Sequence, residues 1–139
     1  MNKSIDRPRY YILVGDETSW KTALEYNQWG FSKKNIGLWN TIMEGELVAF
    51  YATKPIQKII GFGKISEKFT SNDIMWPDEK IFNKSLWENR IKFKIMLVTK
   101  NWNDGIDPPK NMMLNIGRKV IEKKVFCTLI NKAKKKWKI

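Results

Sequence analysis

The stretch "GELVAFYATKPIQKIIGFGKISEKF", Gly45 to Phe69, predicts the centre of the fold. Glu46–Thr53 is rich in aliphatic and aromatic residues and predicts a strand. The KPIQ segment then predicts a turn, and Lys58–Phe69 is a second apolar run. Two such runs around a short turn indicate an antiparallel hairpin. Gly61 and Gly63 alternate in the second strand, which indicates a sharp bend or the close approach of another group.

The residues before this hairpin predict a strand followed by a helix. Arg9–Val14 ("RYYILV") is β-branched and aromatic and is followed by Gly15, which indicates a strand. "DETSWKTALEYNQ" predicts a helix capped by Thr18 or Ser19. Apolar residues at helical spacing place Trp20 on the face of this helix that packs into the core, together with Ala23 and Leu24.

Further elements follow from the same patterns. "NIGLWNTIM" predicts a second short helix ended by Gly45. Residues 71–89 contain Pro77 and many turn residues and predict a long loop. Arg90–Val98 alternates polar and apolar residues, as a half-buried strand does. Residues 118–136 predict a Lys-rich C-terminal helix, with an apolar stripe at Ile121, Val125, Leu129 and Ala133.

The predicted order is strand, helix, helix, strand, strand, long loop, strand, helix. Few helices separate the later strands, which argues against a doubly wound parallel sheet. A chain of 139 residues is the size of one domain with one core, so we expect a single domain over residues 1–139. The predicted fold class is α+β, with a small, strongly curved sheet or barrel and helices outside it.

Composition restricts the chemistry. Histidine is absent and Cys127 is the only cysteine, so a zinc site of histidine and cysteine ligands cannot be built. Nucleophilic catalysis by a Ser–His or Cys–His pair is excluded for the same reason. A single cysteine fits a reducing compartment. No apolar run is long enough to cross a membrane and no signal peptide is evident, so we expect a cytoplasmic protein without a membrane partner.

Charge favours nucleic acid as the partner. The formal net charge is +12, and residues 110–139 contribute +9 of it. Such asymmetry favours an anionic polymer, nucleic acid before a membrane surface. Five lysines are the candidates for phosphate contacts that weaken with salt: Lys33, Lys34, Lys134, Lys135 and Lys136. The alternative is that the C-terminal lysines are only the solvated face of a helix.

Three tryptophans, Trp29, Trp39 and Trp76, lie among polar and turn residues. Large rings held in surface segments contact either the core or a ligand. Two or three rings can form a cage around a flipped base, and stacking contributes about 1–3 kcal/mol per base. The alternative is that these rings close a small barrel as core residues. Ser32 and Asn35 could hydrogen-bond a base nearby, or Asn35 could cap the second helix.

Five segments together resemble an EVE domain of the PUA-like superfamily: "YYILVGDETSWKTALEYNQWGFSKKN", "GELVAFYAT", "IIGFGKISEKF", "MWPDE" and "RIKFKI". The "GELVAFY" strand followed by a Gly-x-Gly strand is the most specific part, although Glu46 stands where EVE domains usually have aspartate. The resemblance covers about residues 9–100. The pattern is also distantly similar to the YTH domain, whose aromatic cage recognises a methylated adenine. It implies a mixed β-barrel of five or six strands flanked by helices.

The resemblance also implies a base-binding pocket. Trp29 and Trp76 match the cage tryptophans of the YTH domain, Ser32 matches a nearby serine, and Asn35 matches a polar base-recognising residue approximately. The strand that lines the EVE pocket contributes two further residues, Tyr51 and Thr53. Trp39 is either a second wall of the pocket or a support behind it.

The implied function is that of a non-catalytic protein without a cofactor. It flips a modified base out of DNA or RNA and stacks it on Trp29 and Trp76. Two alternatives remain. One is an RNA-binding scaffold in a ribonucleoprotein, which predicts binding that depends on salt but not on Trp29. The other is an enzyme that acts on a modified base or nucleoside, with carboxylates near Trp76 and a proton donor as its candidates: Asp73, Asp78, Glu79, Lys64 and Tyr51.

Overall fold

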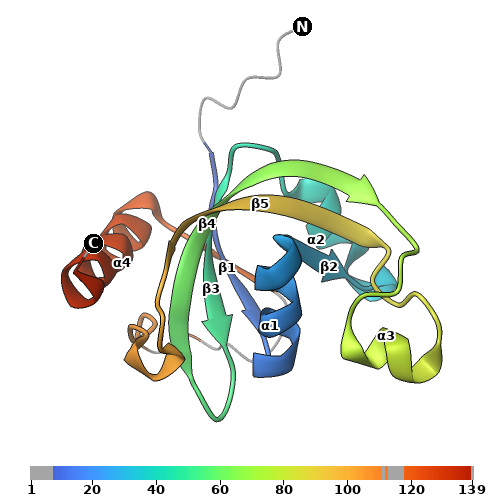
Figure 1. Cartoon of the computed structure of the whole chain (residues 1–139). Coiled ribbons are helices and arrows are strands. Elements are labelled where there is room, and N and C mark those ends of the chain that lie inside the picture. Colours follow the sequence, from blue (N-terminus) through green and yellow to red (C-terminus); the bar gives the residue numbers. More distant parts are fainter. Residues whose placement is uncertain (1–7, 111, 113–117, 139) are drawn as a thin grey trace, which may run out of the picture.

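The computed structural model describes residues 8–110, 112 and 118–138 (Figure 1). Its strands are β1 (Tyr10–Gly15), β2 (Gln28–Phe31), β3 (Leu47–Ala52), β4 (Lys58–Thr70), β5 (Asn89–Val98) and β6 (Arg118–Ile121). Its helices are α1 (Glu17–Tyr26), α2 (Ile36–Thr41), α3 (Pro77–Phe82) and α4 (Lys123–Trp137). Two short 3₁₀ segments, η1 (Lys33–Asn35) and η2 (Trp102–Asp104), complete the elements.

The six strands form one mixed sheet in the order β2-β5-β4-β3-β1-β6. β1 and β3 are parallel, and the other neighbouring pairs are antiparallel. The sheet curls into half a barrel, with the long strands β4 and β5 arching over α1 (Figure 1). This confirms the predicted α+β class and the β3–β4 hairpin.

Each face of the sheet carries its own apolar cluster. The inner cluster includes Trp20, Trp29 and Phe50 and is covered by α1 and α2. The second cluster includes Phe62 and Phe126 and is covered by α4. Burying one Phe or Leu side chain stabilises the fold by about 1.5–3 kcal/mol. The three helices are therefore held on the sheet mainly by their apolar faces.

The two glycines of β4 make room for a core ring. A Cβ on Gly61 would lie 3.0 Å from the Phe50 ring, and one on Gly63 would lie 2.8 Å from it. The pairing of β4 with β5 also shifts between Phe62 and Gly63. The groups that approach these glycines closely are therefore the Phe50 ring and backbone carbonyls of β5, beside an irregularity of the strand.

Four local predictions need correction. The cap of α1 is Asp16 rather than Thr18 or Ser19, because its Oδ1 accepts the Ser19 N–H at 2.7 Å. The predicted first helix, which ran to Gln28, ends at Tyr26, and Gln28–Phe31 form the short strand β2. The 71–89 segment contains α3, since Pro77 occupies a first-turn position where its missing N–H costs nothing. The predicted helix 118–136 is a strand followed by a helix, which begins at Lys123.

No helix in the described ranges has the length and apolar character that crossing a membrane requires.

Candidate nucleic-acid interface

Trp29 lies in the inner core. Its side chain is 9% exposed and stacks on Trp20, with ring centroids 4.1 Å apart and planes at 22°. A Cβ on Gly15 would lie 2.2 Å from Cη2 of Trp29, so the ring fills the space that the missing side chain leaves. Trp20 satisfies its own indole N–H by donating to the Tyr51 carbonyl at 2.8 Å. The predicted placement of Trp20 in the core is confirmed.

Trp76 and Trp87 lie on the other face of β2. Both belong to residues 71–88, hereafter the β4–β5 loop, and Trp76 is 3% exposed. A Cβ on Gly30 would lie 2.5 Å from Cβ of Trp87 and 3.3 Å from the Trp76 ring. Neighbouring residues of a strand point to opposite faces, so Gly30 faces the loop whereas Trp29 faces the core. The structure therefore does not bring Trp29 and Trp76 together, because β2 lies between them.

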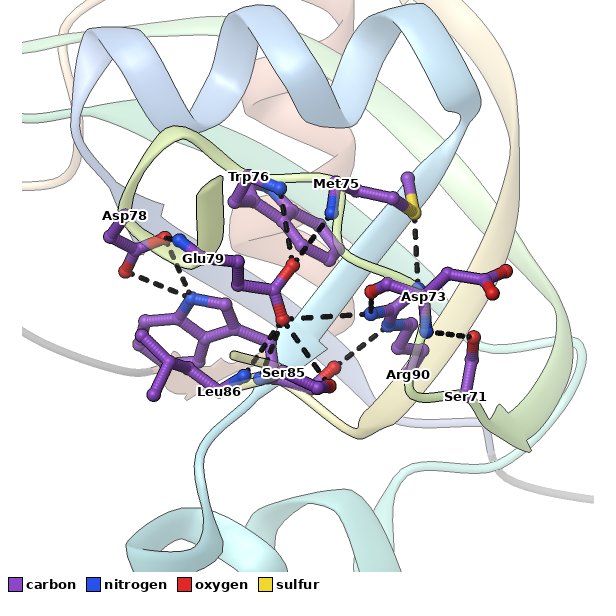
Figure 2. Close-up of polar contacts among 10 residues, drawn as sticks. Ser71, Asp73, Met75, Trp76, Asp78, Glu79, Ser85, Leu86 and Arg90 are labelled. Atoms are coloured by element: carbon purple, nitrogen blue, oxygen red, sulfur yellow. Dashed lines mark hydrogen bonds and ion pairs between the residues drawn. The ribbon is translucent and has the colours of Figure 1, made fainter. Parts of the chain in front are cut away.

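A fully buried carboxylate organises the β4–β5 loop (Figure 2). Oε1 of Glu79 accepts the N–H groups of Met75 at 2.9 Å and Trp76 at 3.1 Å. Oε2 accepts those of Leu86 at 2.8 Å and Trp87 at 3.1 Å. One side chain thus joins the two ends of the loop, and it satisfies four backbone donors that burial would otherwise leave unpaired.

Arg90 of β5 lies beside the Glu79 carboxylate and contacts several parts of the loop (Figure 2). Its Nη2 lies 3.6 Å from Oε2 of Glu79, and both side chains are buried. Its Nε donates to the Trp87 carbonyl at 2.7 Å, and Nη2 also donates to the Asp73 carbonyl. The guanidinium centre lies 5.0 Å from the Trp76 ring centroid, within cation–π range. Removing one partner from such a buried pair is strongly destabilising.

The surroundings of Glu79 favour its ionised form. Burial raises the pKa of this carboxyl, but the four backbone donors outweigh burial and hold the pKa below the ordinary 4.5. Asp78 accepts the Trp87 indole N–H at 3.0 Å. Glu79 and Asp78, two candidate residues of the enzyme hypothesis, are therefore engaged in hydrogen bonds that hold the loop. The described residues contain no group of three or more acidic or cysteine side chains that could hold a metal ion.

Trp39 is the predicted pocket tryptophan that stays partly accessible. It is half-buried on α2, and its Nε1 donates to the Arg90 carbonyl at 2.8 Å. Lys68 of β4 places its Nζ 4.7 Å from the Trp39 ring centroid and donates to the Asn40 carbonyl at 3.3 Å. Burial lowers the pKa of Lys68 below the ordinary 10.5. The result is a fixed aromatic ring beside a partly desolvated cation.

The predicted polar residues are only partly brought together. Thr53 is half-buried directly after β3 and donates its backbone N–H to the Gly15 carbonyl at 2.9 Å. Ser32 is half-buried after β2 and precedes η1 without forming a side-chain cap bond. Asn35 ends η1 directly before α2, and its side chain lies outside the described residues. Tyr51 lies in the second cluster, on the opposite face of β3, where burial raises its pKa.

The predicted phosphate-binding lysines fall into two separate groups. Lys33 and Lys34 are exposed in η1, directly before α2. Lys134, Lys135 and Lys136 are exposed in the last turn of α4, and Lys136 donates to the Gly105 carbonyl at 3.1 Å. α4 lies on the other side of the molecule from α2 and the β4–β5 loop (Figure 1). Only Lys33 and Lys34 therefore lie on the Trp39 side.

The sequence matches no protein-family model and no curated protein. Solved structures do match. ASCH from Zymomonas mobilis has a TM-score of 0.61 at 9% identity, with 88% of this chain and 94% of that chain covered. The YTH domain of Mmi1 in complex with RNA has a TM-score of 0.63 at 16% identity, covering 94% and 82%. The YTH domain of Zygosaccharomyces rouxii MRB1 in complex with N6-methyladenosine RNA has a TM-score of 0.59 at 13% identity, covering 95% and 90%.

At these identities the likeness shows the fold alone. ASCH and YTH domains are PUA-like, so this chain has a PUA-like fold, as the resemblance implied. The match to EVE domains in particular stays a resemblance.

Sequence reasoning missed the Glu79–Arg90 pair. Arg90 opens the alternating strand β5 and lies on the same face of it as Lys92. The loop covers it, which no local pattern shows. The one available signal was Glu79 itself, three residues after Trp76, because a glutamate at this position of a helix can accept the N-cap N–H.

Proposed function

We propose that the protein binds nucleic acid at the Trp39 surface, defined as Trp39, Lys68, Lys33 and Lys34. The observation that carries the proposal is the Trp39 ring, fixed through its indole N–H, partly accessible and 4.7 Å from a lysine ammonium. A fixed ring stacks on a base without first being ordered, and such stacking contributes about 1–3 kcal/mol. The exposed lysines would supply phosphate contacts that position the strand without recognising its sequence.

The finer proposal is that the bound base carries a modification. A YTH domain solved with N6-methyladenosine RNA has the same fold, which supports this choice of ligand. The proposed pocket comprises Trp29, Ser32, Asn35, Thr53 and Trp39, with Trp76 bracing β2 from behind. Tyr51 faces the second cluster and takes no part. Because Trp29 stacks on Trp20, a base enters here only if the Trp29 ring swings off its partner.

The energetics set what a modification contributes. Burying one methyl group is worth about 0.8 kcal/mol, roughly fourfold in affinity. Stronger discrimination requires a penalty against the unmodified base, such as a cavity that stays partly empty. Most of the affinity then comes from stacking and from phosphate contacts, which weaken as salt rises.

The test is a fluorescence-anisotropy titration with short labelled single strands of DNA and RNA. Each strand is unmodified or carries one N6-methyladenine, 5-methylcytosine or 5-hydroxymethylcytosine. Trp39→Ala should weaken binding about tenfold, whereas Trp39→Phe keeps an aromatic ring and should lose less. Lys33→Gln with Lys34→Gln should weaken all strands equally and reduce the salt dependence. Circular dichroism checks that each variant is folded.

The matched control is Lys100→Gln with Lys110→Gln, which removes the same charge from two exposed lysines beyond the far end of β5. If both double variants lost affinity equally, binding would depend only on the net charge of the protein, which would contradict the Trp39 surface. Equal affinity of the wild-type protein for every strand would contradict recognition of a modification and leave nucleic-acid binding intact.

A further inference from the structure

The end of α3 presents two adjacent apolar side chains to solvent. Ile81 is 77% exposed and Phe82 is 69% exposed, the two highest values among the exposed large apolar side chains in the described ranges. Single exposed apolar residues are common on protein surfaces. α3 lies at the outer side of the molecule (Figure 1). Two exposed neighbours there, hereafter the α3 tip, need an explanation, because the same loop buries Trp76 and half-buries Trp87.

The tip is held in place from within the loop. Lys84 donates its N–H to the Glu79 carbonyl at 3.1 Å, and Asn83 takes a left-handed conformation with φ 51° that ends α3. Glu79 itself is bonded to both ends of the loop and paired with Arg90. The apolar pair is therefore displayed by a supported turn whose base is buried.

The charges beside the pair are positive. Lys80 precedes it and Lys84 follows it, and both are exposed. The two acidic residues of the same helix are turned inward, since Glu79 is buried and Asp78 binds the Trp87 indole N–H. Apolar side chains between two cations suit a ligand whose bases are flat and apolar and whose backbone is anionic.

The tip and the Trp39 surface lie at the same end of the sheet. Arg90 joins them, because its backbone carbonyl accepts the Trp39 indole N–H while its guanidinium holds the β4–β5 loop. The two surfaces approach this end of β5 from opposite faces of the sheet. A nucleic acid that passes over this end can therefore meet both.

We infer that the α3 tip is a wedge that separates neighbouring bases of the nucleic acid bound at the Trp39 surface. Phe82 and Ile81 insert between two base steps, and Lys80 and Lys84 contact the flanking phosphates. Apolar side chains inserted in this way partly unstack the bases. The inference rests on the proposed function and adds to it the element that opens the base stack. A protein partner or a membrane surface would use the same apolar pair, and both serve as outcomes of the test.

The experiment uses a duplex that carries one internal 2-aminopurine, whose fluorescence rises when it is unstacked. The wild-type protein should raise that fluorescence severalfold at saturation. Ile81→Ser with Phe82→Ser should bind about tenfold more weakly and leave the fluorescence near that of free duplex even at saturation. Phe82→Leu keeps an apolar wedge and should retain most of the rise. Val120→Ser is the control, because Val120 is 53% exposed on β6, at the opposite edge of the sheet.

Four outcomes would overturn the inference, and they separate it from the proposed function. Normal binding and a normal fluorescence rise in the double-serine variant would contradict the wedge but not the proposed nucleic-acid binding. No binding of any oligonucleotide by the wild-type protein would overturn both proposals. If the double-serine variant lost the binding of the wild-type protein to vesicles of phosphatidylserine and phosphatidylcholine but still bound the duplex normally, the tip would be assigned to a membrane. Wild-type self-association that the double-serine variant abolishes would assign it to a second copy of the chain.

Discussion

Two pairs of tryptophans flank β2, and they are held by different forces. On the core side Trp29 stacks on Trp20 and packs against Gly15, so apolar packing holds its ring in place. On the loop side Trp76 and Trp87 cover Gly30, and a buried ion pair with four backbone hydrogen bonds fixes the segment that carries them. A packed ring needs only a complementary space, whereas the parts of the β4–β5 loop outside α3 need a partner for each buried N–H group. Tryptophans are therefore held by core packing on one face of β2 and by buried polar contacts, hereafter the polar scaffold, on the other.

The largest expected effect is that of Arg90→Met. Methionine keeps the length of the side chain but leaves Glu79 buried without its cation, which should lower the free energy of unfolding by about 3–5 kcal/mol. Urea unfolding of the wild-type and variant proteins measures this difference. Packing on the core side is left intact, so the loss tests the polar scaffold alone.

The control for this loss lies two residues further along the same strand. Lys92 pairs with Glu67 at 3.7 Å, with both side chains about half exposed. Lys92→Met should cost less than about 1 kcal/mol, because solvent screens an exposed pair. If Arg90→Met were no more destabilising than Lys92→Met, the loop would be held by packing and the contrast between the two faces would fail.

Substitution of the two glycines should have an intermediate effect. Gly15→Ala would place a methyl group 2.2 Å from the Trp29 ring, and Gly30→Ala would place one 2.5 Å from Cβ of Trp87. Each should destabilise the protein by about 1–3 kcal/mol, since overpacking displaces neighbours. Thermal unfolding of each single variant gives the size of the loss.

A double-mutant cycle sharpens this prediction. Trp29→Phe removes the ring atoms nearest to Gly15, so Gly15→Ala should cost less in that background than in the wild type. Gly30→Ala should cost the same in both backgrounds, because Gly30 faces the loop. Coupling of Gly30, rather than Gly15, with Trp29 would show that the two faces are not independent.

The smallest expected effect is a dependence on pH. The pKa of Glu79 lies below the ordinary 4.5 in the folded protein, so its contribution to stability is complete above that value. The contribution is lost as the pH falls below 4.5 through the folded pKa, because the unfolded state then binds the proton more readily. Glu79→Gln should show a shallower loss of stability with falling pH than the wild type, measured by urea unfolding between about pH 3 and 7.

Glu67→Gln is the matched control, since Glu67 is exposed and pairs only with Lys92 among the described ion pairs. It should keep the wild-type dependence on pH. A Glu79→Gln variant that lost stability with acid as steeply as the wild type would contradict the role given to the backbone donors.

The sequence predicted the long strands and the fold class because alternation and β-branched runs are local signals. It did not predict β2, which has four residues and contains Gly30, or the change from strand to helix at Glu122. The orientation of Trp29 depended on β2: once residues 28–31 are a strand, alternation directs Trp29 inward with Phe31. The pairing of Glu79 with Arg90 joins the β4–β5 loop to β5 across eleven positions. The position of Glu79 after Trp76 signals its bond to the N-cap N–H but not its contact with Arg90.

The pairing of β1 with β6 also bears on how the chain folds during synthesis. Tyr10 lies opposite Ile121, so one edge of the first strand is completed by β6, the last of the described strands to be made. Contacts between residues so distant in sequence form late, after the entropic cost of closing the intervening chain has been met. A nascent chain that ends before residue 118 exposes the backbone N–H and C=O groups of β1 along that edge. Such an open edge pairs readily with other strands, so a chain truncated there is expected to depend on chaperones or to aggregate.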